Sequence, residues 1–169
     1  SVYPERRGEV VIVTLPDSGR EVTLQRPEHS SSVVYMLATK KYPRPTAPKQ
    51  EVKIMGRMEW VENIAHPNYD REINAWNQRI RTIVTEKLIL YAVANEPTDD
   101  DMVQVDITRG KMGDLVENLT DIEVFIFFVL IQSQEDFEVL SEAIGELTSP
   151  TEAQITDNVQ KFQRKAAGA

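Results

Sequence analysis

The sequence predicts an α+β fold, in which an N-terminal β-hairpin and a third strand pack on a mainly helical body with one long amphipathic helix. Three features predict it: two β-branched runs around a Pro-Asp-Ser-Gly turn, a long stripe of apolar residues at helical spacing, and capping boxes in the second half. The 169 residues are enough to bury a core without disulfides or metals, and they favour one compact domain.

The hairpin is predicted in the first 25 residues. Residues 9–15 are rich in Val and Ile, and residues 20–25 alternate polar and apolar side chains. The segment between them, Pro16 to Gly19, has turn chemistry, because Pro fixes φ, Asp bonds its own backbone and Gly permits a positive φ. An isolated hairpin is marginally stable, so we expect its apolar face to pack on the helical body.

A short ambiguous segment, a loop and the third strand follow the hairpin. Residues 30–32 are serines that offer helix caps, and the apolar residues after them can form one side of a short helix. Three prolines in residues 43–49 forbid a helix and predict an extended, exposed loop, for which a mobile arm is one reading. Residues 52–61 predict the third strand, broken near Gly56.

The proline-rich loop is locally basic. Arg44 and Lys49 lie in it, and Lys40 and Lys41 precede it. Two readings stay open: a solvated linker, or a surface that contacts an acidic partner. Arg44 and Lys49 are therefore candidate partner-binding residues.

The long helix is predicted over residues 68–94, about 40 Å at about 1.5 Å per residue. Its apolar residues recur mostly at steps of three and four, which places them on one stripe of a helix. They are Ile73, Trp76, Ile80, Ile83, Val84, Leu88 and Ile89. His66 precedes Pro67 at the entrance of this helix, where we expect it to cap rather than bind a metal.

Three capping boxes predict further helices over residues 121–132, 134–147 and 150–167. Each box pairs a hydroxyl residue with an acid three residues later: Thr120 with Glu123, Ser133 with Asp136, and Ser149 with Glu152. The segment 124–131 is apolar throughout, so it is either a central core helix or a buried strand, and the cap at its start favours a helix.

The phenylalanines of this region are the second set of candidate partner-binding residues: Phe125, Phe127, Phe128 and Phe137. Three Phe in four positions of a helix cannot all face one way. Either the helix is buried on all sides within the chain, or part of its surface meets another protein.

Composition excludes several classes of function. The net charge of −8 argues against a general nucleic-acid binder. The chain has no cysteine, which excludes a disulfide scaffold, a thiolate zinc site and a cysteine nucleophile. The longest apolar run, residues 124–131, is too short to span a bilayer. Residues 108–113 lack the spacing of a phosphate loop, and the acidic run 99–101 fails the calcium-loop pattern and predicts a capped, solvated turn. We therefore expect no metal, no cofactor and no catalytic site.

Charge divides the chain near residue 60. Residues 1–60 carry 10 Lys and Arg against 7 Asp and Glu, whereas residues 61–169 carry 9 against 20. The charge pattern therefore divides one compact domain into an N-terminal part, residues 1–60, which is basic, and a helical part, residues 61–169, which is acidic. Either the helices have solvated acidic faces, or the two parts meet different partners.

Two local patterns resemble the tail assembly chaperones of tailed bacteriophages. Residues 15–27, Leu-Pro-Asp-Ser-Gly-Arg-Glu-Val-Thr-Leu-Gln-Arg-Pro, resemble the opening of those proteins. Trp60, then Pro67-Asn68-Tyr69-Asp70 and Trp76-Asn77-Gln78-Arg79, are similar to the start of their helix. The resemblance covers about residues 9–92. Asp17 lengthens the turn, and the prolines of residues 43–48 replace a shorter segment.

The resemblance implies a non-enzymatic role in tail morphogenesis. Such chaperones coat the tape-measure protein, help to recruit tail-tube subunits and leave before or during maturation of the particle. The expected partners are therefore the phage tape-measure protein and the tail-tube protein, with a homo-oligomer possible and without nucleic acid or membrane. The expected location is the host cytoplasm during phage assembly. A structural or adaptor protein that stays in the virion is the alternative, and an enzyme acting through paired carboxylates is a third hypothesis.

Overall fold

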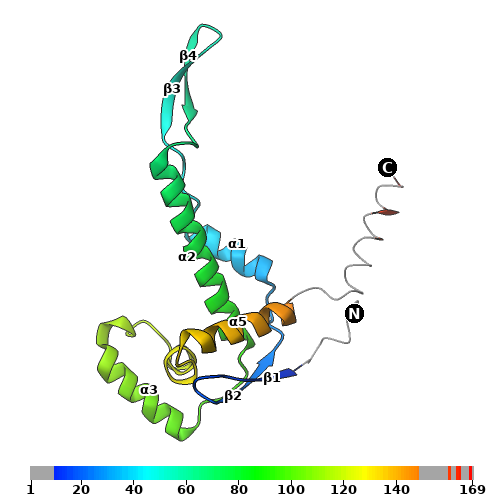
Figure 1. The fold of residues 1–169 in the computed structure, drawn as a ribbon, viewed down its shortest axis with the longest axis vertical. Helices are drawn as coiled ribbons and strands as arrows, with labels where there is room; N and C mark the ends of the chain where they lie inside the picture. Colours follow the sequence, from blue (N-terminus) through cyan, green and yellow to red (C-terminus); the bar gives the residue numbers. More distant parts are fainter. Residues whose placement is uncertain (1–9, 149–159, 161–162, 165–167, 169) are drawn as a thin grey trace. The chain divides into compact units, whose positions relative to one another are not determined.

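The computed structural model describes residues 10–148, 160, 163–164 and 168. In these residues it shows an α+β fold rich in helix, as the sequence predicts (Figure 1). The elements in chain order are β1 (Val10–Thr14), β2 (Glu21–Gln25), α1 (Ser31–Lys41), β3 (Lys49–Ile54), β4 (Arg57–Glu62), α2 (Pro67–Ala92), α3 (Asp99–Met112), the 3₁₀ turn η2 (Gly113–Leu115), α4 (Asp121–Val124), the π-helical turn η3 (Phe125–Leu130) and α5 (Gln134–Thr148).

The chain forms two compact units. One takes in the described residues up to His29 and from Leu88 onward, and the other is Ser30–Lys87. These boundaries differ from the division near residue 60 that the charge pattern indicates. The capping box predicted at 149–152 lies outside the described residues, as does most of the helix predicted at 150–167.

The N-terminal hairpin of the first unit is confirmed. β1 and β2 pair antiparallel, with Val10 opposite Gln25 and Thr14 opposite Glu21. The turn closes through the Leu15 and Gly19 amides, and Gly19 adopts a φ of 69° that favours glycine. Val22 and Leu24 of β2 are completely buried, so this strand contributes to the core of the unit.

The open edge of β2 is covered by the segment after α2. Val93 bridges to Leu24, and the Ala94 amide donates to the Thr23 carbonyl over 2.8 Å. The Asn95 side chain accepts from the Thr23 amide at 2.7 Å and donates to the Glu21 carbonyl at 3.1 Å. The third strand predicted over residues 52–61, with a break near Gly56, does not join this sheet. On the two sides of that break the segment belongs to β3 and β4, which form a separate hairpin.

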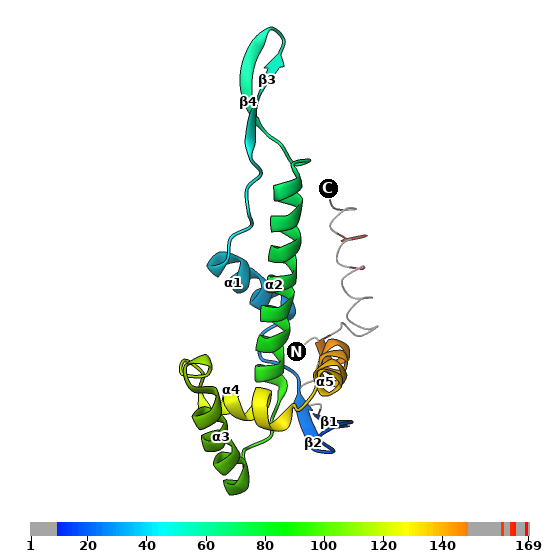
Figure 2. The same ribbon diagram turned by 60° about the vertical axis from the view of Figure 1, so that its left-hand side comes forward.

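A carboxylate at the start of α5 holds the turn of the first hairpin. Asp136 is completely buried, and its two oxygens accept the backbone N–H groups of Asp17 (2.9 Å), Ser18 (3.3 Å) and Gln132 (3.0 Å). Ser133 caps the helix by accepting from the Asp136 amide, as predicted, but the Asp136 carboxylate accepts from the Gln132 amide, so the return bond of a capping box to Ser133 is not made. Figures 1 and 2 both place α5 beside this hairpin, and α5 contacts β1.

Arg20 ties the other end of the same turn to α3. Its guanidinium pairs with both oxygens of Asp101, at 2.5 and 3.0 Å, and lies 5.8 Å from the centroid of the Phe125 ring. Asp101 also completes a capping box with Thr98 at the start of α3. The capped turn predicted at residues 99–101 is the first turn of α3, and Asp99 and Asp100 are exposed as predicted, but Asp101 is buried rather than solvated.

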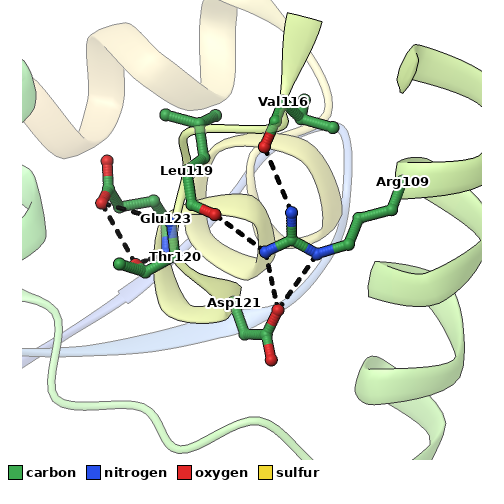
Figure 3. Close-up of polar contacts among 6 residues, drawn as sticks. All are labelled: Arg109, Val116, Leu119, Thr120, Asp121 and Glu123. Carbon is green, nitrogen blue, oxygen red and sulfur yellow. Dashed lines mark hydrogen bonds and ion pairs between the residues drawn. The ribbon is translucent and has the colours of Figure 1, made fainter. Parts of the chain in front are cut away.

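Arg109 organises the connection from α3 to α4 (Figure 3). Its guanidinium donates to the backbone carbonyls of Val116 (3.1 Å) and Leu119 (2.8 Å) and pairs with Asp121 at 2.7 Å. The capping box of Thr120 and Glu123 is confirmed beside it. The helix predicted over 121–132 is α4 followed by the π-helical turn η3, which ends at Leu130.

The second unit contains α1, the hairpin β3–β4 and most of α2. The long helix is confirmed at Pro67–Ala92, close to the predicted 68–94. The ring nitrogen Nδ1 of His66 accepts from the Asn68 amide at 3.1 Å, which confirms the predicted capping role. Ile80 is the most buried residue of the stripe in this unit, at 1% exposed.

Candidate functional site

The outer face of α1 is strongly apolar. Ser30 caps this helix by accepting from the Val33 amide, and Lys40 and Lys41 fall in its last turn, where cations favour a helix end. Only Val34 and Ala38, one turn apart, are buried. The large apolar side chains between and beside them are exposed: Val33 by 38%, Tyr35 by 49%, Met36 by 47% and Leu37 by 54%. We call these four residues the α1 apolar face.

A hollow borders this face within the second unit. It has a volume of about 350 Å³ and is lined by Ser31, Ser32, Tyr35 and Val84, so it lies where α1 meets α2. The hydroxyl groups provide hydrogen-bonding capacity, and Tyr35 and Val84 provide apolar surface. A protein side chain docked on the α1 apolar face has room to enter it.

A second hollow lies where the proline-rich segment begins. Its volume is about 430 Å³, and it is lined by Lys41, Tyr42, Pro43, Pro45, Glu72, Ala75, Trp76 and Arg79. The Trp76 indole donates to the Tyr42 carbonyl at 2.8 Å, and the Arg79 guanidinium stacks 3.9 Å from the centroid of the Tyr42 ring. These contacts fix the start of the segment on α2.

The proline-rich loop has no regular secondary structure and is largely exposed, as the sequence predicts. Ala47 departs from this, because it is only 6% exposed. The two basic candidates lie on its surface: Arg44 is exposed in the loop, and Lys49 is the exposed first residue of β3, opposite Glu62. Neither is a lining residue of the two hollows.

The hairpin β3–β4 exposes apolar residues on both of its faces. Apart from Val52 and Val61, which are half-buried, every residue of the two strands is exposed. Trp60 is 66% exposed and Met58 56%, and Met55 at the tip is fully exposed. The large apolar side chains of this hairpin are therefore uncovered within the described residues.

The phenylalanine candidates do not share one environment. Phe125 is completely buried and belongs to the core. Phe127 and Phe137 are half-buried, whereas Phe128 is 38% exposed. Phe125, Phe127 and Phe128 lie in η3, where consecutive side chains face different directions, and Phe137 lies in α5. Among the four, Phe128 is the side chain most available to a partner.

The buried carboxylates of the described residues are engaged in structural contacts. The Arg20 guanidinium, by its hydrogen bonds, holds the pKa of Asp101 at about 2, and bonds from Thr98 lower it further against the opposing effect of burial. Asp101 is thus ionised at neutral pH and has no proton to donate. Asp136 uses its oxygens on three backbone amides, as described above.

Metal-binding geometry is absent from the part of the chain that the structure describes: no three His, Cys, Asp or Glu side chains there come together to hold an ion. His29 packs edge-on against Tyr91, with ring centroids 5.8 Å apart, and His66 caps α2. None of the helices among the described residues is both long and apolar enough to cross a membrane.

Sequence reasoning missed the α1 apolar face and both hollows. The signal was present, since residues 33–37 are five consecutive apolar residues and cannot all face one side of a helix. Comparison of the chain with models of protein families, with curated proteins and with solved structures gave no match.

Proposed function

We propose that the chain is a non-enzymatic assembly factor of tailed bacteriophages, a tail assembly chaperone that binds the tape-measure protein, tail-tube subunits or both. The observation that carries the proposal is the α1 apolar face, which leaves more large apolar side chains uncovered than α1 buries. The sequence resemblance over residues 9–92 supplies the identity of the client.

The α1 apolar face suits a helical client. Val33, Met36 and Leu37 are spaced as i, i+3 and i+4, so they form one stripe against which an amphipathic helix can pack. Met36 adds an adaptable contact, as in proteins that bind varied helices. One such stripe is small, so each copy of the chain binds the client weakly. Many copies bound along a long client together give a high total affinity, and each copy can still dissociate.

Acidic charge supports a holding role. With a net charge of −8, copies of this chain repel one another, which favours a dispersed state. Release requires competition by the tube protein or a change in the client. In this proposal the chain acts in the host cytoplasm during phage assembly.

The proposal is tested by co-expressing the chain with an apolar segment of the tape-measure protein and measuring the soluble fraction of that segment. The wild-type chain is expected to keep it soluble, and the double variant M36E/L37E is expected to lose this activity. A matched control is V103E/I107E, which places the same charges on α3 residues that are 55% and 43% exposed. If both double variants behave alike, the α1 apolar face is not the client site.

A structural or adaptor protein of the virion is the second candidate function. The observation that favours it is the β3–β4 hairpin, whose uncovered strands suit contacts between neighbouring subunits. Quantitative mass spectrometry of mature virions and of the infected lysate separates the two. Abundance in the lysate and absence from virions supports the chaperone, whereas a fixed copy number in virions contradicts it and places the chain in the particle.

A further inference from the structure

The β3–β4 hairpin has two uncovered edges. Among the described residues it forms a sheet of two strands, and neither β3 nor β4 pairs with any other strand. A sheet of two strands is marginally stable in water, and an uncovered strand presents unpaired N–H and C=O groups to any further strand. A strand added at one edge would satisfy these groups.

The turn determines which backbone groups of β3 point outward. Met55 and Gly56 form a two-residue turn and both have positive φ, 49° and 80°, as in a type I′ turn. The residues flanking such a turn, Ile54 and Arg57, form a hydrogen-bonded pair, and the pairs alternate from there. The backbone groups of Lys49, Glu51 and Lys53 therefore face the open edge of β3.

We propose that a second copy of this chain pairs with β3 along this edge, antiparallel and around a twofold axis at Val52. In this register Glu51 of each copy lies opposite the partner's Lys53, as an outward-facing, hydrogen-bonding pair. The twofold axis repeats this attraction, so two opposite-charge pairs flank a central contact between the two Val52 side chains. The strand order of the joint sheet is β4–β3–β3–β4.

Charge selects this register over its neighbours. A shift that centres the axis on Glu51 places that carboxylate opposite its own copy, and a shift that centres it on Lys53 does the same for the ammonium groups. Like charges directly opposite each other destabilise a sheet, whereas opposite charges stabilise it. If one β3 strand shifts along the other by a single residue, its side chains move to the opposite face of the sheet. Its outward-facing backbone groups then lie opposite residues of the partner whose backbone groups point toward β4, and the hydrogen bonds between the copies are lost.

The joint sheet also gathers apolar side chains. Trp60 lies opposite Glu51 and Met58 opposite Lys53 in the hairpin, so these four residues share one face. On that face each Glu51–Lys53 pair is flanked by Trp60 of one copy and by Met58 of the other. The β3–β3 contact uses the same strand of both copies, so this contact closes on itself as a dimer.

A single-cysteine experiment tests the geometry, because the chain has no cysteine of its own. In the proposed sheet the two Val52 positions form a non-hydrogen-bonded pair, whose Cα atoms are about 4.5 Å apart, within the range of a disulfide. V52C is expected to form a covalent dimer on mild oxidation. V61C is the matched control, since Val61 is also half-buried in this hairpin but lies on β4. Failure of V52C to link, or equal linking by V61C, overturns the proposal.

Charge reversal tests the register in solution. Glu51→Lys and Lys53→Glu each place like charges opposite one another, and each is expected to raise the dimer dissociation constant about tenfold or more in sedimentation velocity. The double variant E51K/K53E restores opposite charges and is expected to dimerise like the wild type. An equimolar mixture of the two single variants is expected to form a heterodimer for the same reason. Unaffected single variants, or a mixture that stays monomeric, would overturn the register.

This test is independent of the client. The assay contains no tape-measure protein, and M36E/L37E is expected to dimerise normally because its changes lie on α1. A chain that dimerises through β3 but does not hold a client would refute the proposed function alone, and the reverse result would refute the dimer alone.

Discussion

Removal of the Asp136 carboxylate is expected to loosen the first unit more than any surface change on the same helix. This side chain is completely buried, and its two oxygens accept three backbone N–H groups, two from the turn of the first hairpin and one from Gln132. Asp136→Ala leaves all three donors without this acceptor.

The magnitude follows from these bonds. An unsatisfied buried donor costs about 1–3 kcal/mol. Asp17 is exposed and Ser18 is half-buried, so water can reach the turn, and the lower end of this range applies. Three donors at about 1 kcal/mol each give a loss of about 3 kcal/mol in the free energy of unfolding. With a urea m-value of about 2 kcal/mol per molar, the midpoint falls by about 1.5 M.

The assay is urea unfolding followed by circular dichroism, with two controls on the same helix. Ser133→Ala removes only the helix cap and is expected to cost about 1 kcal/mol. Glu142→Ala changes an exposed residue in the middle of α5 and is expected to stay within about 0.5 kcal/mol of the wild type. If Asp136→Ala lowers the free energy of unfolding by no more than Ser133→Ala does, the carboxylate stabilises only its own helix. The stabilising role of its hydrogen bonds to the hairpin turn is then refuted.

Three other substitutions have defined outcomes. The pKa of Asp101 is about 2 against an ordinary 3.8, so its pairing with Arg20 stabilises the fold above pH 4. The loss in free energy of unfolding caused by Asp101→Asn should therefore shrink by about 2 kcal/mol as the pH falls from 4 to 2. Urea titrations that give the same loss at every pH would contradict this. Met55→Asn should stabilise the hairpin by about 1 kcal/mol, because Asn tolerates the positive φ of 49°, and tryptic cleavage within the hairpin should slow rather than quicken. Trp76→Phe removes the 2.8 Å bond to the Tyr42 carbonyl, so cleavage in the segment after α1 should quicken; unchanged rates would show that this bond does not hold the segment.

Local chemistry made the hairpin, the long helix and two caps predictable. The Pro16–Gly19 turn, the apolar stripe of α2 and the boxes at Thr120 and Ser133 each depend on residues within a few positions of one another. The start of α3 carries the same kind of signal, a Thr98–Asp101 box, but the capped turn predicted there continues into a helix of 14 residues.

Contacts between distant residues could not be predicted. Asp136 lies 119 positions from Asp17, and Asp101 lies 81 from Arg20, so no sequence spacing relates them. The hydrogen bond from the Thr23 amide of β2 to the Asn95 side chain likewise joins residues that are far apart in the sequence. For the candidate site, the apolar run that gives the α1 apolar face is visible in the sequence, but which of its residues are buried depends on packing against the rest of the unit. The break predicted near Gly56 in the strand over 52–61 is the turn between β3 and β4. A hairpin was not predicted there because Met55 stands where Asn or Asp usually precedes the glycine.

The distance along the chain between Asp17 and Asp136 also sets an order of events during synthesis. The unit formed by Ser30–Lys87 is continuous and can fold as soon as it leaves the ribosome, whereas the other unit is interrupted by it. The first hairpin emerges early and has no acceptor for its turn amides until α5 has been made, 119 residues later. The N-terminal hairpin is therefore synthesised well before the helix that secures its turn, and its apolar strands stay without that support until α5 has been made.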